Sequence, residues 1–585
     1  MRSCSTANTN MLWGCVTAKT LSYLGVQYAV ICPGSRSAPL AIGFSDNTDI
    51  RSISALDERS ASFFALGRAI QCKKPVVIIC SSGTAAANFY PAVIEASLSN
   101  VPLIILTADR PSELQGCHAP QSIDQIKLFG NYPRWQISMM NPCPDIKAFQ
   151  YLRQSLMHAY MRAEYPHPGP VHLNFPFREP LAPIFDPDIE ELCAVTTGKA
   201  FYQNVVSPKY FTTIAPSHSI KDEIQLLRSA KKGIFVIGPT IAQNPSTFAT
   251  SVGAIAASLG WPTLTDALNP LRNFQDKNQY LICHYDTILR NKDLAQKLRP
   301  DCVLAIGALP TSKVLRAWLE TADPITFLIS PQPDNLDPCH RRVRRICLDL
   351  SAFEQSLLCT KTDLSQYCKS WLLYEEKTRL QIFNIMQHQD LILEAKIPWF
   401  LARNLPEKTP IHIANSTPIR DVEYFWPSNN RHIVPTFNRG TNGIDGTVSS
   451  GMGMAHYNQP SVLLTGDLSF LHDSNGLLIN HEMKGSLTIV IINNNGGRIF
   501  ESLFMPTSDI LFERYFVTPQ NIILSKFAEA HRIPCFQPQT WGRFLTLIAE
   551  LPSSFSRIIV LNINNEKNTL FRKSMLDNVP RQLES

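Results

Sequence analysis

The sequence lacks the features that would place the protein in a membrane or in a secreted, disulfide-stabilised class. Its longest apolar runs are of strand length and interrupted, so we expect no membrane-spanning helix. Residues 1–10 contain no apolar core of signal-peptide length. The 15 cysteines are scattered and never form a Cys-x-x-Cys pair, which favours reduced thiols over a disulfide framework or a zinc site. These absences predict a cytoplasmic protein.

The sequence also has only a small excess of positive over negative charge. The chain carries 54 lysines and arginines against 48 aspartates and glutamates, and its net charge of +6 is not gathered into a basic block. We therefore expect no nucleic-acid partner. The Gly-x-Gly-x-x-Gly motif of dinucleotide-binding proteins is missing after the first predicted strand, where Pro33-Gly34-Ser35-Arg36 stands instead. This difference disfavours a nucleotide-binding or redox protein built on Rossmann-like units.

What the chain does contain is a repeated alternation of apolar strands and amphipathic helices. The strands end in polar turns, which is typical of doubly wound parallel sheets, and 585 residues are too many for one core. We predict strands at 28–31, 76–80, 103–106, 171–174, 233–238, 262–266, 301–307, 324–329, 411–414, 432–435, 462–464, 487–492 and 558–563. The fold class is therefore α/β, with three domains at 1–190, 215–350 and 380–585. Residues 180–222 are predicted as a linker and 331–345 as a loop.

The segment 461–500 is predicted as a strand, a helical crossover and a second parallel strand. Asp467 follows the first strand, while Asn494 and Gly496 follow the second. The carboxyl ends of such strands meet at one edge of the sheet, where ligands bind. A carboxylate, an amide oxygen and a backbone carbonyl would leave room around Mg²⁺ for water and two diphosphate oxygens. The alternative is that these residues are only ordinary turn formers.

A second predicted ligand site follows the strand 28–31. The Gly/Ser turn at 33–37 would present backbone N–H groups and the Arg36 guanidinium to an anion.

The order of these landmarks resembles that of the thiamin-diphosphate-dependent enzymes of the pyruvate decarboxylase and acetohydroxyacid synthase type. Within that superfamily the resemblance is strongest to the menaquinone-pathway synthases that join 2-oxoglutarate to isochorismate. It is carried, besides 461–500, by PGSRS at 33–37, DER at 57–59, TADRP at 107–111, NFPFREPL at 174–181, PTSK at 310–313, NSTPIRD at 415–421 and NRGTNGIDG at 438–446. These segments cover nearly the whole chain in the family's order. The resemblance implies a pyrimidine-binding, a central and a diphosphate- and metal-binding domain.

The resemblance also implies thiamin diphosphate with Mg²⁺ or Mn²⁺ as cofactors. Glu58 would be the catalytic acid that holds a proton on the aminopyrimidine ring, from a dry pocket that raises its pKa. Without the family context, Glu58 would be read as an exposed acid at a helix start. The implied metal ligands are Asp467, Asn494 and the Gly496 carbonyl. Further implied cofactor contacts are Gly466, Ser469 and Ile444, with Ile444 as the wedge that bends the cofactor.

Both implied substrates are dicarboxylates, which guanidinium groups bind well. By family position, the implied substrate contacts are Arg36, Arg110, Arg420 and Arg439, with Ser35, Gln121, Lys313 and Ser416. Ile499 and Phe500 would form an apolar wall that keeps water from the reacting carbon. The chain departs from the family pattern at Pro120, where Asn is usual, and at Arg498.

The implied function is that of a carboligase, a transferase that decarboxylates 2-oxoglutarate on the cofactor and adds the succinyl carbanion equivalent to isochorismate by conjugate addition. The implied assembly is a homodimer or homotetramer with active sites between subunits. One alternative is another thiamin-diphosphate decarboxylase or carboligase with a different acceptor. An inactive relative is disfavoured because Glu58, Asp467 and Asn494 are all present.

Overall fold

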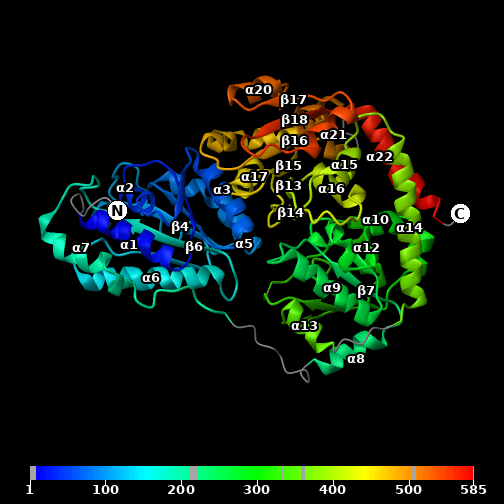
Figure 1. Ribbon diagram of the computed structural model, residues 1–585, viewed down its shortest axis with the longest axis horizontal. Helices are drawn as coiled ribbons and strands as arrows, with labels where there is room; N and C mark the ends of the chain where they lie inside the picture. Colours follow the sequence, from blue (N-terminus) through cyan, green and yellow to red (C-terminus); the bar gives the residue numbers. More distant parts are fainter. Residues whose placement is uncertain (1–7, 211–219, 333, 358–362, 503–508, 584–585) are drawn as a thin grey trace. The chain divides into compact units, whose positions relative to one another are not determined.

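The described residues form three six-stranded parallel sheets that follow one another along the chain (Figure 1). The computed structural model describes residues 8–210, 220–332, 334–357, 363–502 and 509–583. The predicted α/β class with doubly wound sheets is confirmed. The sheets lie between residues 28 and 176, 233 and 346, and 410 and 562.

The first sheet has the strand order β2-β1-β3-β4-β6-β5. Its strands are β1 (Tyr28–Ile31), β2 (Arg51–Ser54), β3 (Val76–Cys80), β4 (Leu103–Asp109), β5 (Trp135–Ser138) and β6 (Pro170–Pro176). The buried strands β3, β4 and β6 confirm the predictions, whereas the partly exposed edge strands β2 and β5 were not predicted. The accompanying helices are α1 (Thr9–Tyr23), α2 (Ala38–Ser45), α3 (Glu58–Cys72), α4 (Thr84–Asn88), α5 (Tyr90–Leu98) and α6 (Ile146–Glu164).

The second sheet has the order β12-β11-β10-β7-β8-β9. Its strands are β7 (Gly233–Ile237), β8 (Thr263–Thr265), β9 (Leu281–Ile282), β10 (Cys302–Ile306), β11 (Ile325–Ile329) and β12 (Val343–Ile346). The prediction of a loop at 331–345 is wrong where β12 begins, because this edge strand pairs with β11 although Arg344 and Arg345 are exposed. Its helices include α8 (Lys221–Ser229), α9 (Pro245–Leu259), α10 (Tyr285–Leu289), α11 (Lys292–Lys297), α12 (Lys313–Ala322), α13 (Leu350–Ser356) and α14 (Gln366–Gln387).

The third sheet has the order β14-β13-β15-β16-β18-β17, which repeats the topology of the first sheet strand for strand. Its strands are β13 (Pro410–Ile413), β14 (Val434–Thr436), β15 (Ser461–Gly466), β16 (Leu487–Asn493), β17 (Cys535–Phe536) and β18 (Arg557–Asn562). The first and third domains are therefore built on the same plan. The helices include α15 (Lys396–Asn404), α16 (Thr417–Phe425), α17 (Thr447–Ala455), α18 (Asp467–His472), α20 (Leu524–Ala530), α21 (Trp541–Ala549) and α22 (Asn565–Arg581).

The contacts divide the chain into two compact units. The first comprises 1–210, 438–458 and 469–486, and the second comprises 211–437, 459–468 and 487–585. In the first unit, glycines let α3 and α17 approach closely. A Cβ on Gly67 would lie 2.0 Å from the Ser450 carbonyl oxygen, and one on Gly453 would lie 1.9 Å from that of Phe64. Any larger residue at either glycine would force the two backbones apart.

The predicted linker at 180–222 is wrong for much of its length. Helix α7 (Glu190–Thr197) and two short 3₁₀ helices occupy its first half. Apolar side chains of this stretch, among them Ile189, Phe201 and Tyr202, are buried in the core of the first sheet. The prolines used to predict a linker therefore lie partly in a folded segment. Residues 211–219 of the predicted linker lie outside the described residues.

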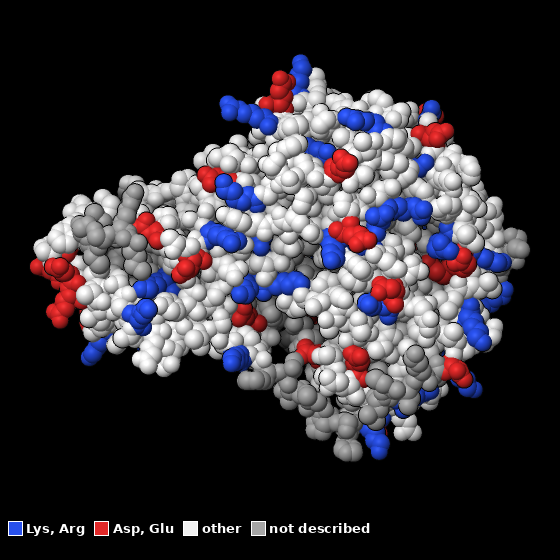
Figure 2. Space-filling model, in the orientation of Figure 1, with Lys and Arg blue, Asp and Glu red and all other residues white. Residues whose placement is uncertain are grey.

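Three further features bear on the class of protein. The described cysteines are free thiols apart from Cys193, which is disulfide-bonded and so departs from the expectation of reduced thiols throughout. Within the described residues, no helix combines the length and apolarity needed to cross a membrane. On the face that Figure 2 shows, basic and acidic side chains of described residues are interspersed, with no continuous basic region.

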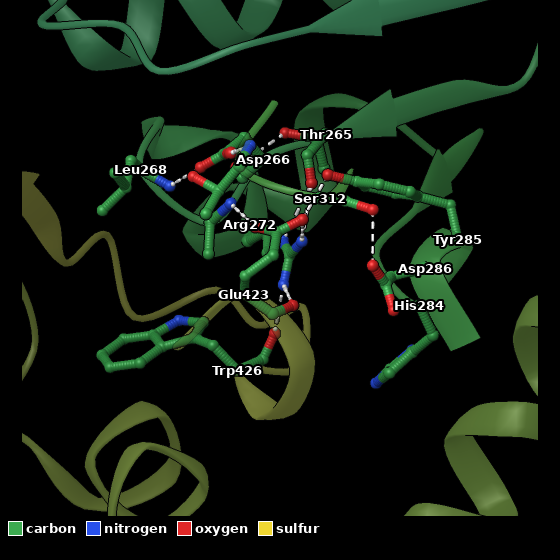
Figure 3. A network of polar contacts seen from close by, with 12 residues as sticks. Thr265, Asp266, Leu268, Arg272, His284, Tyr285, Asp286, Ser312, Glu423 and Trp426 are labelled. Carbon is green, nitrogen blue, oxygen red and sulfur yellow. Dashed lines mark hydrogen bonds and ion pairs between the residues drawn. The ribbon is translucent and has the colours of Figure 1, made fainter. Parts of the chain in front are cut away.

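A buried ion pair in the second unit ties α16 to the residues around β8 (Figure 3). Arg272 is fully buried, and its guanidinium lies 3.1 Å from the Glu423 carboxylate. The same guanidinium donates to the carbonyls of Thr265, Glu423 and Trp426. Glu423 also accepts from the Tyr285 hydroxyl. Because all three guanidinium nitrogens have acceptors, α16 is held in one position.

Replacing Arg272 by Met should lower the free energy of unfolding by about 3–5 kcal/mol, because Glu423 would remain buried without its counter-charge. Chemical denaturation of the purified protein measures this. The double variant Arg272→Met/Glu423→Gln should recover part of the loss. A double variant as unstable as the sum of the two single changes would show that the pair is not coupled.

Candidate active site

Asp467 and Asn494 meet at the carboxyl edge of the third sheet. They follow the neighbouring strands β15 and β16, in which Gly466 lies opposite Ile492. The Gly496 N–H donates to Asp467 Oδ2 at 2.8 Å, and the Leu468 N–H donates to Oδ1 at 2.9 Å. The structure therefore brings together all three residues that are predicted to bind the metal.

In the Asn494 side-chain amide, the NH₂ group has a hydrogen-bond partner among the described residues and the oxygen does not. Its side chain is buried, with Asn494 only 7% exposed, and its Nδ2 donates to Glu394 Oε1 at 2.7 Å. Its Oδ1 is buried and accepts no hydrogen bond from any residue that the structure describes. An unsatisfied buried acceptor costs about 1–3 kcal/mol. A divalent cation at this oxygen would remove that cost, so the donor set fits a metal ion.

The surroundings of Asp467 also fit a cation. Burial, with a smaller contribution from the nearby Glu394 carboxylate, raises the pKa of the Asp467 carboxyl to about 6. A positive ion beside this carboxylate would stabilise its charged form. Within the described part of the chain, no cluster of three or more His, Cys, Asp or Glu side chains could hold a metal. The mixed set of carboxylate, amide oxygen and backbone carbonyl is therefore the candidate cation site.

Two glycines shape this edge in different ways. Gly496 has φ +130°, and a Cβ there would lie 2.3 Å from the Val517 carbonyl oxygen, so only glycine fits the turn. A Cβ on Gly466, in contrast, would meet no atom within 4 Å. Space is therefore open beside Gly466, where a diphosphate could approach the backbone.

Sequence reasoning missed the residues that support Asn494. Arg572 on α22 donates to Glu394 Oε2 at 2.6 Å and to Asp421 Oδ2 at 2.8 Å. Asn565, at the start of the same helix, donates to the Asn494 carbonyl at 2.9 Å. The spacing of seven residues from Asn565 to Arg572 places both on one helix face, which is the only signal the sequence offered.

Glu58 is the first residue of α3, in the first unit. Asp57 caps this helix by accepting from the Ser60 N–H at 3.1 Å, and its other oxygen accepts from Asn475 Nδ2 at 2.7 Å. Glu58 is half-buried and lines a cavity of about 370 Å³ together with Leu56, Asp57, Arg59, Asn88, Asn475 and Leu478. In a single chain the surroundings of Glu58 are thus wetter than the dry pocket expected from the sequence.

Arg36 and Arg110 are buried near each other at the edge of the first sheet. Arg36 donates to the Phe177 carbonyl at 2.9 Å and pairs with Glu179 at 3.1 Å. Burial and the positive charge of Arg110 both lower the pKa of Arg36. The carboxylates of exposed Glu179 and buried Asp109 also act on Arg36, so the two positive charges are balanced, and what the pair offers a substrate carboxylate is its N–H donors.

Gln121 and Ser35, the other predicted substrate contacts of the first sheet, lie near Arg110 because all three are close to Ser81 and Ser82. Arg110 Nη1 donates to Ser82 Oγ at 2.7 Å, and the exposed Gln121 donates to the Ser82 carbonyl at 3.1 Å. A Cβ on Gly34 would lie 2.3 Å from Ser81 Cβ, so the turn that carries the exposed Ser35 packs against the same serines.

The remaining predicted residues fall into separate places. Arg420 donates to the Ser416 carbonyl at 2.6 Å, so these two lie together at the start of α16. Lys313 is exposed at the start of α12. Ile499 and Phe500 are half-buried in a 3₁₀ helix, Arg498–Ser502.

In the first unit, Arg439 is half-buried beside Gly440, whose N–H donates to the Glu95 carboxylate at 2.7 Å. The Ile444 carbonyl accepts from Thr447 Oγ1 at 2.9 Å and from Ser469 Oγ at 3.4 Å. Ile444 and Ser469, two of the expected cofactor contacts, are therefore neighbours.

The departure at Arg498 has a structural explanation. Its guanidinium pairs with Glu513 at 2.6 Å and with Glu501 at 3.1 Å. Its charge is thus compensated within the chain.

Comparison with known proteins assigns the chain to a family. Residues 13–128 match the thiamine pyrophosphate enzyme N-terminal TPP binding domain, 206–413 the middle domain of thiamine pyrophosphate enzymes, and 420–563 the C-terminal TPP binding domain. The 2-succinyl-5-enolpyruvyl-6-hydroxy-3-cyclohexene-1-carboxylate synthase of Rippkaea orientalis is 45% identical over 99% of this chain and 98% of its own length. The chain belongs to this synthase family. The enzyme of the same name from Microcystis aeruginosa is 46% identical over 96% of this chain and 98% of its own.

Membership of the synthase family makes thiamin diphosphate, also called thiamine pyrophosphate, the cofactor, and enzymes of this type use a divalent metal such as Mg²⁺. The fold agrees with a more distant enzyme. The crystal structure of benzoylformate decarboxylase from Polynucleobacter necessarius superposes with a TM-score of 0.69 at 16% identity, covering 94% of this chain and 98% of the other.

Gly466→Ala provides a direct test of the open space in the synthase. The methyl group would clash with nothing in the protein, so the melting temperature of the cofactor-free variant should stay unchanged. The affinity for thiamin diphosphate with Mg²⁺ should fall, because the methyl would occupy the space of the diphosphate. Gly542→Ala, at a glycine of α21 that is equally uncrowded, is the matched control and should bind normally. Unchanged affinity in Gly466→Ala would place the diphosphate elsewhere.

Proposed function

We propose that the protein decarboxylates 2-oxoglutarate on thiamin diphosphate and transfers the remaining succinyl unit to isochorismate by conjugate addition, a step of menaquinone biosynthesis. The observation that carries the proposal is the unsatisfied oxygen of Asn494 beside Asp467, in a chain that belongs to the synthase family. We place the pyrimidine-binding domain at 1–190, the central domain at 215–350 and the diphosphate- and metal-binding domain at 380–585. We infer a cytoplasmic location.

The metal would be held by the Asp467 carboxylate, Asn494 Oδ1 and the Gly496 carbonyl. The open backbone at Gly466 and the hydroxyl of Ser469 would receive the diphosphate, and Ile444 would support the bent cofactor. When bound, the cofactor supplies the nucleophilic carbon and accepts the electrons left by carbon dioxide. The chain's own residues fix its position and its charge.

Glu58 would hold a proton at a ring nitrogen of the cofactor's aminopyrimidine. A carboxyl group does this best where water is excluded. Leu56, which lines the Glu58 cavity, is 68% exposed, and Leu478 across the cavity is 37% exposed. Burial of these exposed apolar side chains against a second copy of the chain would be favourable. We therefore propose a homodimer or homotetramer with active sites between subunits.

The substrate carboxylates would be bound by arginines. Arg36 and Arg110 offer a buried pair of guanidinium groups, and Arg420 and Arg439 offer two further ones. Ser35, Gln121, Lys313 and Ser416 would add polar contacts. Ile499 and Phe500 would exclude water from the reacting carbon, which prevents its protonation to a wasted aldehyde.

Product analysis separates this function from that of a carboligase with a different acceptor. Purified protein with thiamin diphosphate, Mg²⁺ and 2-oxoglutarate should release carbon dioxide faster when isochorismate is added, and the carbon should appear in a joined product. Carbon dioxide release that isochorismate does not alter, with succinic semialdehyde as the product, would contradict the proposed acceptor. The test matters because Pro120 stands where the family usually has Asn. Proline has no backbone N–H, so it cannot donate a backbone hydrogen bond to the second substrate.

Glu58→Gln should reduce kcat by about 10²–10⁴-fold, because an amide cannot share the proton of the ring nitrogen as a carboxyl group does. The variant should keep its melting temperature. Glu190→Gln is the matched control, since Glu190 is also the first residue of a helix and is exposed. Near-normal turnover of Glu58→Gln would remove its catalytic role and leave only a contribution to the helix terminus.

A further inference from the structure

Asn494 can serve a metal only if its amide is turned the right way. The amide offers an oxygen that can bind a cation and an NH₂ group that cannot. Both ends of this side chain are buried, so its orientation is decided by whatever faces the other end. That group is Glu394, whose Oε1 accepts from Asn494 Nδ2 at 2.7 Å. An ionised carboxylate only accepts hydrogen bonds, so it selects the NH₂ group.

Glu394 is itself held in place by residues of α16 and α22. It is 2% exposed, and its Oε2 accepts from Arg572 Nη2 at 2.6 Å. Arg572 is oriented by a bidentate pair with Asp421, which is fully buried. The Glu394 N–H donates to Asn568 Oδ1 at 3.1 Å. Because Arg572 bonds to Oε2, it fixes which of the two Glu394 oxygens faces Asn494.

We propose that Glu394, fixed by Arg572 and Asp421, is a positioning residue that turns the oxygen of Asn494 toward the metal. The inference rests on the proposed function, in which Asn494 is a metal ligand. Glu394 would not touch the metal, and its effect would pass through the hydrogen bond to Nδ2 alone. Such outer partners of a metal ligand change metal affinity by about 10–100-fold when they are removed.

The support comes from outside the segment that carries the ligand. Asn494 and Asp421 lie within the C-terminal domain match of 420–563, whereas Glu394 lies within the middle-domain match and Arg572 lies beyond residue 563. Arg572 also joins the ligand to α16, on which Asp421 directly follows the predicted substrate residue Arg420. The metal ligand and the substrate helix are therefore held by the same guanidinium.

Glu394→Gln tests the proposal with an isosteric change. Arg572 is only a donor, so the introduced glutamine would turn its amide oxygen toward Arg572 and its NH₂ group toward Asn494. Asn494 would then have to present its oxygen to that NH₂ group and its own NH₂ group to the metal. We expect the Mg²⁺ affinity at saturating thiamin diphosphate to fall by about 10–100-fold. Titration of metal-free protein, followed by calorimetry, measures the affinity without turnover.

Adding Asn494→Asp to Glu394→Gln should restore the site. In this double variant, the introduced glutamine would donate its NH₂ group to one oxygen of the introduced carboxylate and leave the other oxygen for the metal. The double variant should therefore regain most of the lost affinity, which a purely structural role for Glu394 would not allow. Should Glu394→Gln alone fail to fold, the double variant carries the test by itself. Glu375→Gln is the matched control, because Glu375 is also buried but bonds to His284.

The outcomes are distinct. Wild-type Mg²⁺ affinity in Glu394→Gln, or a folded double variant that does not bind Mg²⁺, would overturn the role of Glu394 and leave the proposed function intact. Cofactor binding that needs no divalent metal in the unaltered protein would overturn the metal site itself. Weak binding in the single variant with recovery in the double variant is the result we expect.

Discussion

A buried amide oxygen without a hydrogen-bond partner among the described residues, next to a buried carboxylate, is the feature on which the functional account depends. It exists because β15 and β16 are neighbours in one parallel sheet and end at the same edge, so Asp467 and Asn494 emerge side by side. Gly496 closes the turn by donating to Asp467, and its carbonyl accepts from the Arg498 N–H at 2.9 Å, with a second lone pair on that oxygen for a ligand. Buried acceptors in folded proteins are usually paired, so this oxygen is a candidate position for a bound ligand. The arrangement would suit the metal and diphosphate of the proposed function.

Contacts within each unit hold the residues of the proposed site in place. In the second unit, the ion pair of Arg272 and Glu423 holds α16, and Asp421 on the same helix holds Arg572. In the first unit, the close approach of α3 and α17 through Gly67 and Gly453 fixes the helix that begins with Glu58. The first and third sheets share their strand order, but Glu58 follows β2, whereas Asp467 and Asn494 follow β15 and β16, which correspond to β3 and β4.

Much of the fold was predictable from the sequence because its central strands are continuous apolar runs that end in polar turns. Strands β3, β7, β10 and β16 are of this kind. Edge strands such as β2 and β12 are short and carry exposed side chains, so no periodic pattern marks them. Their formation depends on a neighbouring strand that only the folded chain supplies. The segment 187–202 inside the predicted linker was likewise misread, because its packing against the first core leaves no local signal.

The candidate site was predictable to a similar degree. Asp467, Asn494 and Gly496 stand at strand ends and follow from the topology, whereas Glu394 and Arg572 lie 100 and 78 residues from Asn494 and meet it only in three dimensions.

The central claim is tested most directly by a crystal structure with thiamin diphosphate and Mn²⁺, in which anomalous scattering locates the ion. The account predicts one peak within coordination distance of the Asp467 carboxylate, Asn494 Oδ1 and the Gly496 carbonyl. A bound cofactor whose metal lies away from these three oxygens would contradict it.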